Sequence, residues 1–162
     1  MMPDVETMRV IEEKWLDQLV EMARKTVENG KVYGKKCNKH GWYSEERCPQ
    51  CGQRHKQILQ RAQLSNLKNL ADATDSVRVL ELFIRYQMGR KEGAGWKYAP
   101  EGDERFGDMV IADLQRLEEW AQEINPSDPR AAHLGLIRLY TGFLIRWYVA
   151  FSGEDSGGET EE

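Results

Sequence analysis

The chain has 162 residues, of which 40% are hydrophobic and 31% are charged, and its formal net charge is −4. This composition is typical of one soluble domain, or of one domain with a small appendage, and it disfavours two large independent cores. It also excludes a uniformly basic surface, although residues 31–61 carry eight Lys or Arg side chains against two Glu side chains, a local excess of six positive charges.

The first predicted helix covers residues 4–29 and ends near Gly30. Apolar side chains recur in it at intervals of three or four, at Val5, Met8, Ile11, Trp15, Leu19, Met22 and Ala23. This spacing is typical of an amphipathic helix. Acidic residues interrupt the stretch in which a signal peptide would need its apolar segment. We therefore expect a cytoplasmic protein.

The helical periodicity stops after Gly30 and gives way to two pairs of metal-ligand residues. Cys37 and His40 are separated by two residues, as are Cys48 and Cys51. Such a gap lets one tight turn aim two side chains at a single ion, and two such turns complete the tetrahedral shell that zinc prefers. The sequence predicts a structural Zn²⁺ site within a short hairpin. His55 is an alternative fourth ligand in place of His40.

The metal segment is also basic. We predict that Lys35, Lys36, Lys39, Arg47 and Arg54 contact RNA, because basic side chains neutralise phosphates. Two neighbouring aromatic residues, Trp42 and Tyr43, are able to stack on unpaired bases. The alternative is that these two rings pack a module too small to own a core, while the lysines keep it soluble.

Helical spacing resumes after the metal segment and predicts a second helix over 53–73 and a third from Asp75 or Ser76 to Arg90. The third helix carries apolar side chains around most of its circumference, so we expect it to be buried on most sides. Residues 91–107 are rich in Gly and predict a long loop.

Two further helices are expected, over 108–124 and 128–151. The last is strongly apolar but contains Arg138 and Arg146, which favours a buried or partner-facing helix over a membrane span. The predicted fold is all-α, a bundle of about five helices with an inserted zinc module. Its parts are an N-terminal helix (1–30), the zinc module (31–56), the helical bundle (57–152) and a disordered acidic tail (153–162).

No arrangement of catalytic residues is apparent. All four positions of the predicted zinc shell are filled, which leaves no open position for a substrate or an activated water. His133 stands alone among apolar neighbours and is more typical of a core histidine than of a general base. We therefore expect a protein that is not an enzyme.

Three stretches resemble a known family. These are SNLKNL at 65–70, YQMGR at 86–90, and a closing aromatic helix that runs from Leu139 into Phe151-Ser152-Gly153. In this order they resemble the small, all-helical Csm-type subunit of type III-A CRISPR interference complexes. The resemblance covers somewhat more than half of the chain. The inserted zinc module and the length of the 91–107 loop depart from that family's pattern.

The resemblance implies a non-catalytic subunit that stacks along the effector complex and helps hold guide RNA and target RNA. Lys68 and Arg90 are the matched positions that it assigns to RNA, whereas Arg85 is predicted from the residue pattern alone. Other subunits of the complex and self-association are the implied partners. The alternative is a free-standing zinc-module regulator, or an adaptor that binds DNA or another protein.

Overall fold

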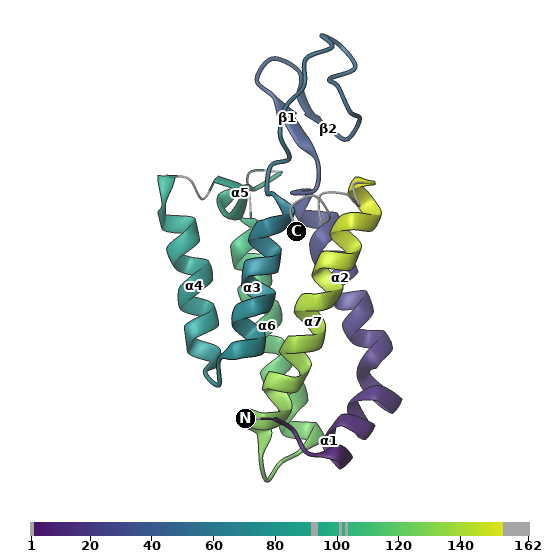
Figure 1. Ribbon diagram of the computed structural model, residues 1–162, viewed down its shortest axis with the longest axis vertical. Coiled ribbons are helices and arrows are strands. Elements are labelled where there is room, and N and C mark those ends of the chain that lie inside the picture. Colours follow the sequence, from purple (N-terminus) through teal and green to yellow (C-terminus); the bar gives the residue numbers. More distant parts are fainter. Residues whose placement is uncertain (1, 92–93, 101, 103, 154–162) are drawn as a thin grey trace.

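A computed structural model describes residues 2–91, 94–100, 102 and 104–153. The long helices lie side by side along the long axis of the molecule, and a two-stranded hairpin projects from one end (Figure 1). The all-α fold with a small inserted module is therefore confirmed. The predicted acidic tail, apart from Gly153, falls outside the described residues.

The N-terminal helical segment runs through α1 (Val5–Val10), a π-helical turn η1 (Ile11–Trp15) and α2 (Leu16–Gly30). It begins where the Thr7 backbone N–H donates to Asp4 Oδ1 at 2.7 Å. It ends at Lys31, which adopts the left-handed conformation (φ 57°). The predicted helix over 4–29 is confirmed, but its spacing did not indicate the π-turn.

The inserted hairpin pairs β1 (Lys35–Cys37) with β2 (Gly41–Tyr43) in an antiparallel register. The chain then returns alongside the base of β1. The Ile58 N–H donates to the Gly34 carbonyl at 2.8 Å, and the Leu59 N–H donates to the Val32 carbonyl at 3.1 Å. The expectation of a helix from residue 53 is thus wrong, because these amides serve the hairpin base. The helix begins only at Arg61.

Helices α3 (Arg61–Ala73) and α4 (Val77–Gly89) follow, and Ser76 caps α4 by accepting the Val79 N–H at 3.4 Å. Helix α4 lies on the outside of the bundle. Among the described elements, it packs substantially only against α3, α5 and α6. Three large apolar side chains on its outer face are exposed, namely Val79 (40%), Leu82 (66%) and Tyr86 (62%). The expectation that this helix is buried on most sides is therefore wrong.

The segment predicted as a long loop contains a short helix, α5 (Ala94–Lys97). Its Trp96 is buried and its Nε1–H donates to Gln63 Oε1 at 3.4 Å. Gly95 lies against the chain at Ile58, where an added Cβ would come within 2.5 Å of the carbonyl oxygen. This segment therefore covers the end of the bundle from which the hairpin projects.

Helix α6 (Phe106–Ile124) and helix α7 (Pro129–Ser152) complete the bundle. Helix α7 packs against α2, α3 and α6, and its side chains Leu136, Tyr140, Leu144 and Tyr148 are buried at intervals of four residues. By length and composition alone α7 is the one described helix that is apolar enough to cross a membrane. Its central position in the bundle accounts for that composition.

Candidate metal centre and basic surface

Two tight turns bring four potential metal ligands together at the tip of the hairpin. Cys37 ends β1, His40 lies in the turn before β2, and Gly41 takes up a positive φ of 81°. In the second turn the Gly52 N–H donates to the Cys48 carbonyl at 2.8 Å, which places Cys51 beside Cys48. Glycine suits both positive-φ positions, since Gly52 has a φ of 76°.

The ligand atoms of Cys37, His40, Cys48 and Cys51 all lie within 4.8 Å of one another. Cys37 Sγ is 3.4 Å and Cys48 Sγ is 3.5 Å from His40 Nδ1, and Cys37 Sγ is 3.8 Å from Cys51 Sγ. The four side chains are therefore close enough to bind one metal ion. No other such group of three or more His, Cys, Asp or Glu occurs in the described part of the chain.

The electrostatics of the cluster suit a cation. Burial opposes ionisation of Cys37, but the backbone amides of Lys39 and His40 donate to its sulfur, and the pKa of this thiol falls to about 6. At Cys51 the Gln53 backbone amide favours the thiolate, yet burial and the neighbouring sulfurs raise the pKa overall. The neighbouring sulfurs therefore oppose ionisation of Cys51, and a bound cation would offset that repulsion.

His55 lies outside the cluster. Its Nδ1 is 2.7 Å from the hydroxyl of Tyr43, and the two rings meet edge to face. Tyr43 is itself buried with Cys37 and Cys48 in the small core of the module. Of the two histidines, the geometry places His40 and not His55 among the four potential ligands.

Trp42 also has a packing role. Its Nε1–H donates to the Lys31 carbonyl at 2.9 Å, and its ring meets Tyr33 edge to face. Gly34 makes this possible, because a Cβ there would come within 2.4 Å of the indole. Of the two interpretations offered for Trp42 and Tyr43, the geometry favours packing over base stacking.

The predicted RNA-binding cations of the module divide into two kinds. Lys36, Lys39, Arg47 and Arg54 are exposed, although Arg54 also pairs with Glu46 at 3.0 Å. Lys35 is only 8% exposed, and its ammonium donates to the Glu45 carbonyl at 2.9 Å. Lys35 therefore stabilises the hairpin. We call the four exposed side chains, Lys36, Lys39, Arg47 and Arg54, the hairpin basic surface.

The three predicted RNA contacts in the bundle lie on α3, on α4 and just after α4. The ammonium of Lys68 donates to the Arg138 carbonyl at 2.8 Å and pairs with Asp72 at 2.9 Å, which ties α3 to α7. Arg85 is exposed on α4. Arg90 follows α4 and lies over the Tyr86 ring at 5.8 Å.

The interpretation of His133 as a core histidine is consistent with its surroundings. It is buried in α7, and its Nε2 lies 2.8 Å from the Leu114 carbonyl. Burial lowers the pKa of this imidazole, which keeps it neutral.

One polar cluster was missed by the sequence reasoning. Asp113 is only 6% exposed, and its Oδ2 accepts hydrogen bonds from the hydroxyls of Thr26 and Tyr140. These residues come from three helices and share no local motif. The signal that could have revealed them is the position of Asp113 on the apolar stripe of α6, between the buried Val110 and Leu117.

The fold and site define a helical bundle with a hairpin at one end, and this hairpin holds four residues close enough to bind a metal ion. No protein-family model matches the chain, no curated protein is significantly similar to it, and no solved structure matches it.

Proposed function

We propose that this protein is a non-catalytic RNA-binding structural subunit of a type III CRISPR effector complex, where it helps hold guide RNA and target RNA. One observation carries the proposal. A metal-binding hairpin projects from the bundle (Figure 1) and displays four exposed cations, Lys36, Lys39, Arg47 and Arg54. Such side chains neutralise phosphates, which supports contact with RNA.

Zinc is the metal that we propose for the hairpin. An ion with bonds of about 2.3 Å to sulfur and about 2.0–2.1 Å to nitrogen, in tetrahedral geometry, sets sulfurs about 3.8 Å apart and sulfur and nitrogen about 3.5 Å apart. The distances around Cys37 and His40 are 3.8, 3.4 and 3.5 Å. Three thiolates and one Zn²⁺ together contribute one negative charge, so the module remains basic.

The resemblance to the Csm-type small subunit supports the finer assignment. The stretch at 65–70 lies within α3, that at 86–90 covers the end of α4, and the aromatic closing helix is α7. Helix α7 ends at Ser152, and Gly153 follows with a positive φ of 72°.

The outer face of α4 supports membership of a larger assembly. Val79, Leu82 and Tyr86 recur at intervals of three and four residues and are all exposed. An apolar stripe of this kind on a helix is often covered by another protein surface. We propose another subunit of the effector complex as that surface.

RNA binding is tested by titrating single-stranded RNA against the metal-loaded protein at several salt concentrations. We expect the double variant Lys36→Ala with Lys39→Ala to weaken binding and to flatten the salt dependence by about 1.4 in log–log slope, the share of two phosphate contacts on a single strand. The matched control, Arg9→Ala with Lys14→Ala, removes two exposed charges from the N-terminal helical segment. Equal loss in both variants would contradict a specific hairpin surface.

Membership of the complex is tested by co-purification. The tagged protein, expressed together with the products of its neighbouring genes, should elute with a guide RNA and with other subunits. If it elutes alone under conditions in which a guide-RNA complex forms, the CRISPR assignment fails. The RNA titration alone would then decide whether the protein binds RNA.

A second candidate is a free-standing zinc-module regulator or adaptor. The observation in its favour is that Trp42 and Tyr43 are committed to packing, so the hairpin has no aromatic platform for unpaired bases. Binding by charge alone would not distinguish RNA from duplex DNA. Equal affinity for duplex DNA and single-stranded RNA would favour this candidate.

A further inference from the structure

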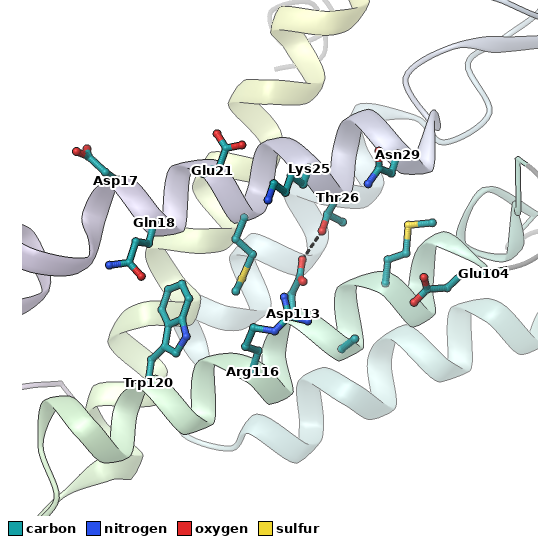
Figure 2. Close-up of a pocket in the computed structure, with 13 residues that line it drawn as sticks. Asp17, Gln18, Glu21, Lys25, Thr26, Asn29, Glu104, Asp113, Arg116 and Trp120 are labelled. Atoms are coloured by element: carbon teal, nitrogen blue, oxygen red, sulfur yellow. Dashed lines mark hydrogen bonds between the residues drawn. The ribbon is translucent and has the colours of Figure 1, made fainter.

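A hollow between α2 and α6 and a smaller one in the hairpin each contain a buried ionisable side chain. In the first, of about 650 Å³, Asp113 accepts hydrogen bonds from the Thr26 hydroxyl (Figure 2) and from the Tyr140 hydroxyl. This carboxyl group therefore has its partners within the protein. The hairpin pocket, of about 340 Å³, holds Lys35, whose ammonium has fewer partners than it is able to take.

The hairpin pocket lies where the chain returns alongside β1. Gln57 forms an antiparallel bridge with Lys35, which fixes the returning segment against the strand. The side chains that line the pocket are Lys35, Glu46, Arg54, His55, Lys56 and Gln57. The pocket is thus built on backbone pairing, and it contains none of the four potential metal ligands.

Lys35 supplies the buried charge of the pocket. It is only 8% exposed, and its ammonium lies 6.0 Å from the centre of the Tyr43 ring. An ammonium has three N–H donors, and among the described residues only the Glu45 carbonyl, at 2.9 Å, accepts one of them. A buried charge without an opposite charge is costly. An anion in the pocket would supply both the missing acceptors and the opposite charge.

His55 adds a second donor to the pocket. Its Nδ1 is 2.7 Å from the Tyr43 hydroxyl, which leaves Nε2 as the ring nitrogen open to a ligand. When Tyr43 donates its hydroxyl proton to Nδ1, the neutral imidazole carries its own proton on Nε2. This nitrogen is then a hydrogen-bond donor, as the Lys35 ammonium is.

The remaining charges make the pocket positive. Lys35, Arg54 and Lys56 line it against the single carboxylate of Glu46, so three cations and one anion give a formal charge of +2 with His55 neutral. Glu46 pairs with Arg54 at 3.0 Å, but both side chains are more than half exposed, so this pair is weak. Lys56 is exposed and joins no ion pair within the described part of the chain.

We propose that this pocket binds a terminal phosphomonoester of an RNA strand, an inference that rests on the RNA-binding function proposed above. A phosphomonoester carries about −1.5 to −2 charges at pH 7 and three acceptor oxygens. These match the charge of the pocket and the donors of Lys35 and His55. An internal phosphodiester carries a single charge and should bind there less tightly. Lys36 and Lys39 lie outside the pocket and stay available to internal phosphates.

The experiment is calorimetric titration of the metal-loaded, full-length protein in phosphate-free buffer at fixed ionic strength. The probes are three single-stranded RNAs of one sequence, with a 5′-phosphate, with a 3′-phosphate and with neither. We expect a terminal phosphate to strengthen binding about tenfold, because hydrogen bonds to a charged group are gained. Equal affinity for the three RNAs would overturn the pocket and leave RNA binding intact. Absence of binding by all three would overturn both.

Variants locate the pocket through the preference for a terminal phosphate, which is the ratio of the two affinities. Lys35→Met removes the buried ammonium and should abolish the preference. Glu46→Gln removes the opposing carboxylate and should raise the preference about twofold to fivefold. The matched control, Glu45→Gln, removes a neighbouring exposed charge outside the pocket and should leave the preference unchanged. Equal preference in Glu46→Gln and Glu45→Gln would contradict the pocket even if Lys35→Met failed to fold.

Discussion

The hairpin with its four potential metal ligands and the helical bundle bury very different amounts of apolar surface. The buried core of the hairpin is only Cys37, Tyr43 and Cys48, whereas the bundle shares one apolar core across all of its long helices. A segment that buries so little apolar surface needs an additional stabilising element, such as a bound metal, to hold its conformation. The difference predicts that a bound ion stabilises the hairpin while the apolar core stabilises the bundle. Each part should therefore fail separately.

The largest effect is expected from Cys48→Ser, which removes one ligand. Structural metal binding contributes about 10–16 kcal/mol in zinc-finger peptides, so losing it should unfold the hairpin. Metal content should drop and hydrogen exchange over 31–60 should accelerate, while helical circular dichroism persists. The control His55→Ala should retain one metal ion per chain. Unchanged metal content in Cys48→Ser would contradict the four-ligand site.

The converse change is Leu114→Ala in the bundle. Leu114 is fully buried in α6, and truncation of such a leucine costs about 2–5 kcal/mol. Urea unfolding should show that loss while the metal content stays the same. Leu82→Ala is the matched control, since Leu82 is 66% exposed and its truncation should change stability by less than about 0.5 kcal/mol. Loss of the metal in Leu114→Ala would mean that the two parts fold as one unit.

A smaller effect is expected at the junction of the two parts. A Cβ at Gly34 would come within 2.4 Å of the Trp42 indole, so Gly34→Ala should cost about 1–3 kcal/mol by overpacking. Tryptophan fluorescence and exchange over 31–43 would report the change. Gly89→Ala is the control, because no atom lies within 4 Å of its added Cβ. Equal stability of the two variants would show that the junction is not tightly packed.

The sequence predicted most of both parts because their signals are local. The ligand spacing from Cys37 to Cys51 predicted the cluster, and apolar periodicity predicted the long helices. The helix expected from residue 53 failed because Ile58 and Leu59 have helical spacing, yet their amides pair with the distant residues Gly34 and Val32. Periodicity records which side chains are apolar, and it does not record where backbone groups find partners.

Exposure was the other weak point of sequence reasoning. The apolar side chains around α4 predicted burial, but Leu82 and Tyr86 face outward because no described element covers that side. Apolar composition does not distinguish a face covered within the chain from a face that awaits a partner. The cluster of Thr26, Asp113 and Tyr140 was not predicted from the sequence for a related reason, since its members meet only in the folded bundle.

The smallest expected effect concerns the polar cluster of the bundle, formed by Thr26, Asp113 and Tyr140. It distinguishes this cluster from the metal-ligand cluster of the hairpin. Burial raises the pKa of Asp113 above its usual value of 3.8, and the Thr26 and Tyr140 hydroxyls oppose that shift only in part. The folded state thus holds a proton that the unfolded chain releases. The stability contributed by Asp113 is complete below pH 3.8 and is lost as pH rises through the raised pKa.

Asp113→Asn should remove this dependence, because an amide does not titrate. Unfolding free energies of wild type and variant, measured by urea from pH 3.5 upward, should differ most at the acid end. The wild type should lose its advantage as pH increases. Protonation of the hairpin thiolates releases the metal in both proteins alike, so it cancels in the difference. A difference that grows with pH would mean that Asp113 is stabilised as a carboxylate, as an internal cation such as Arg116 would achieve.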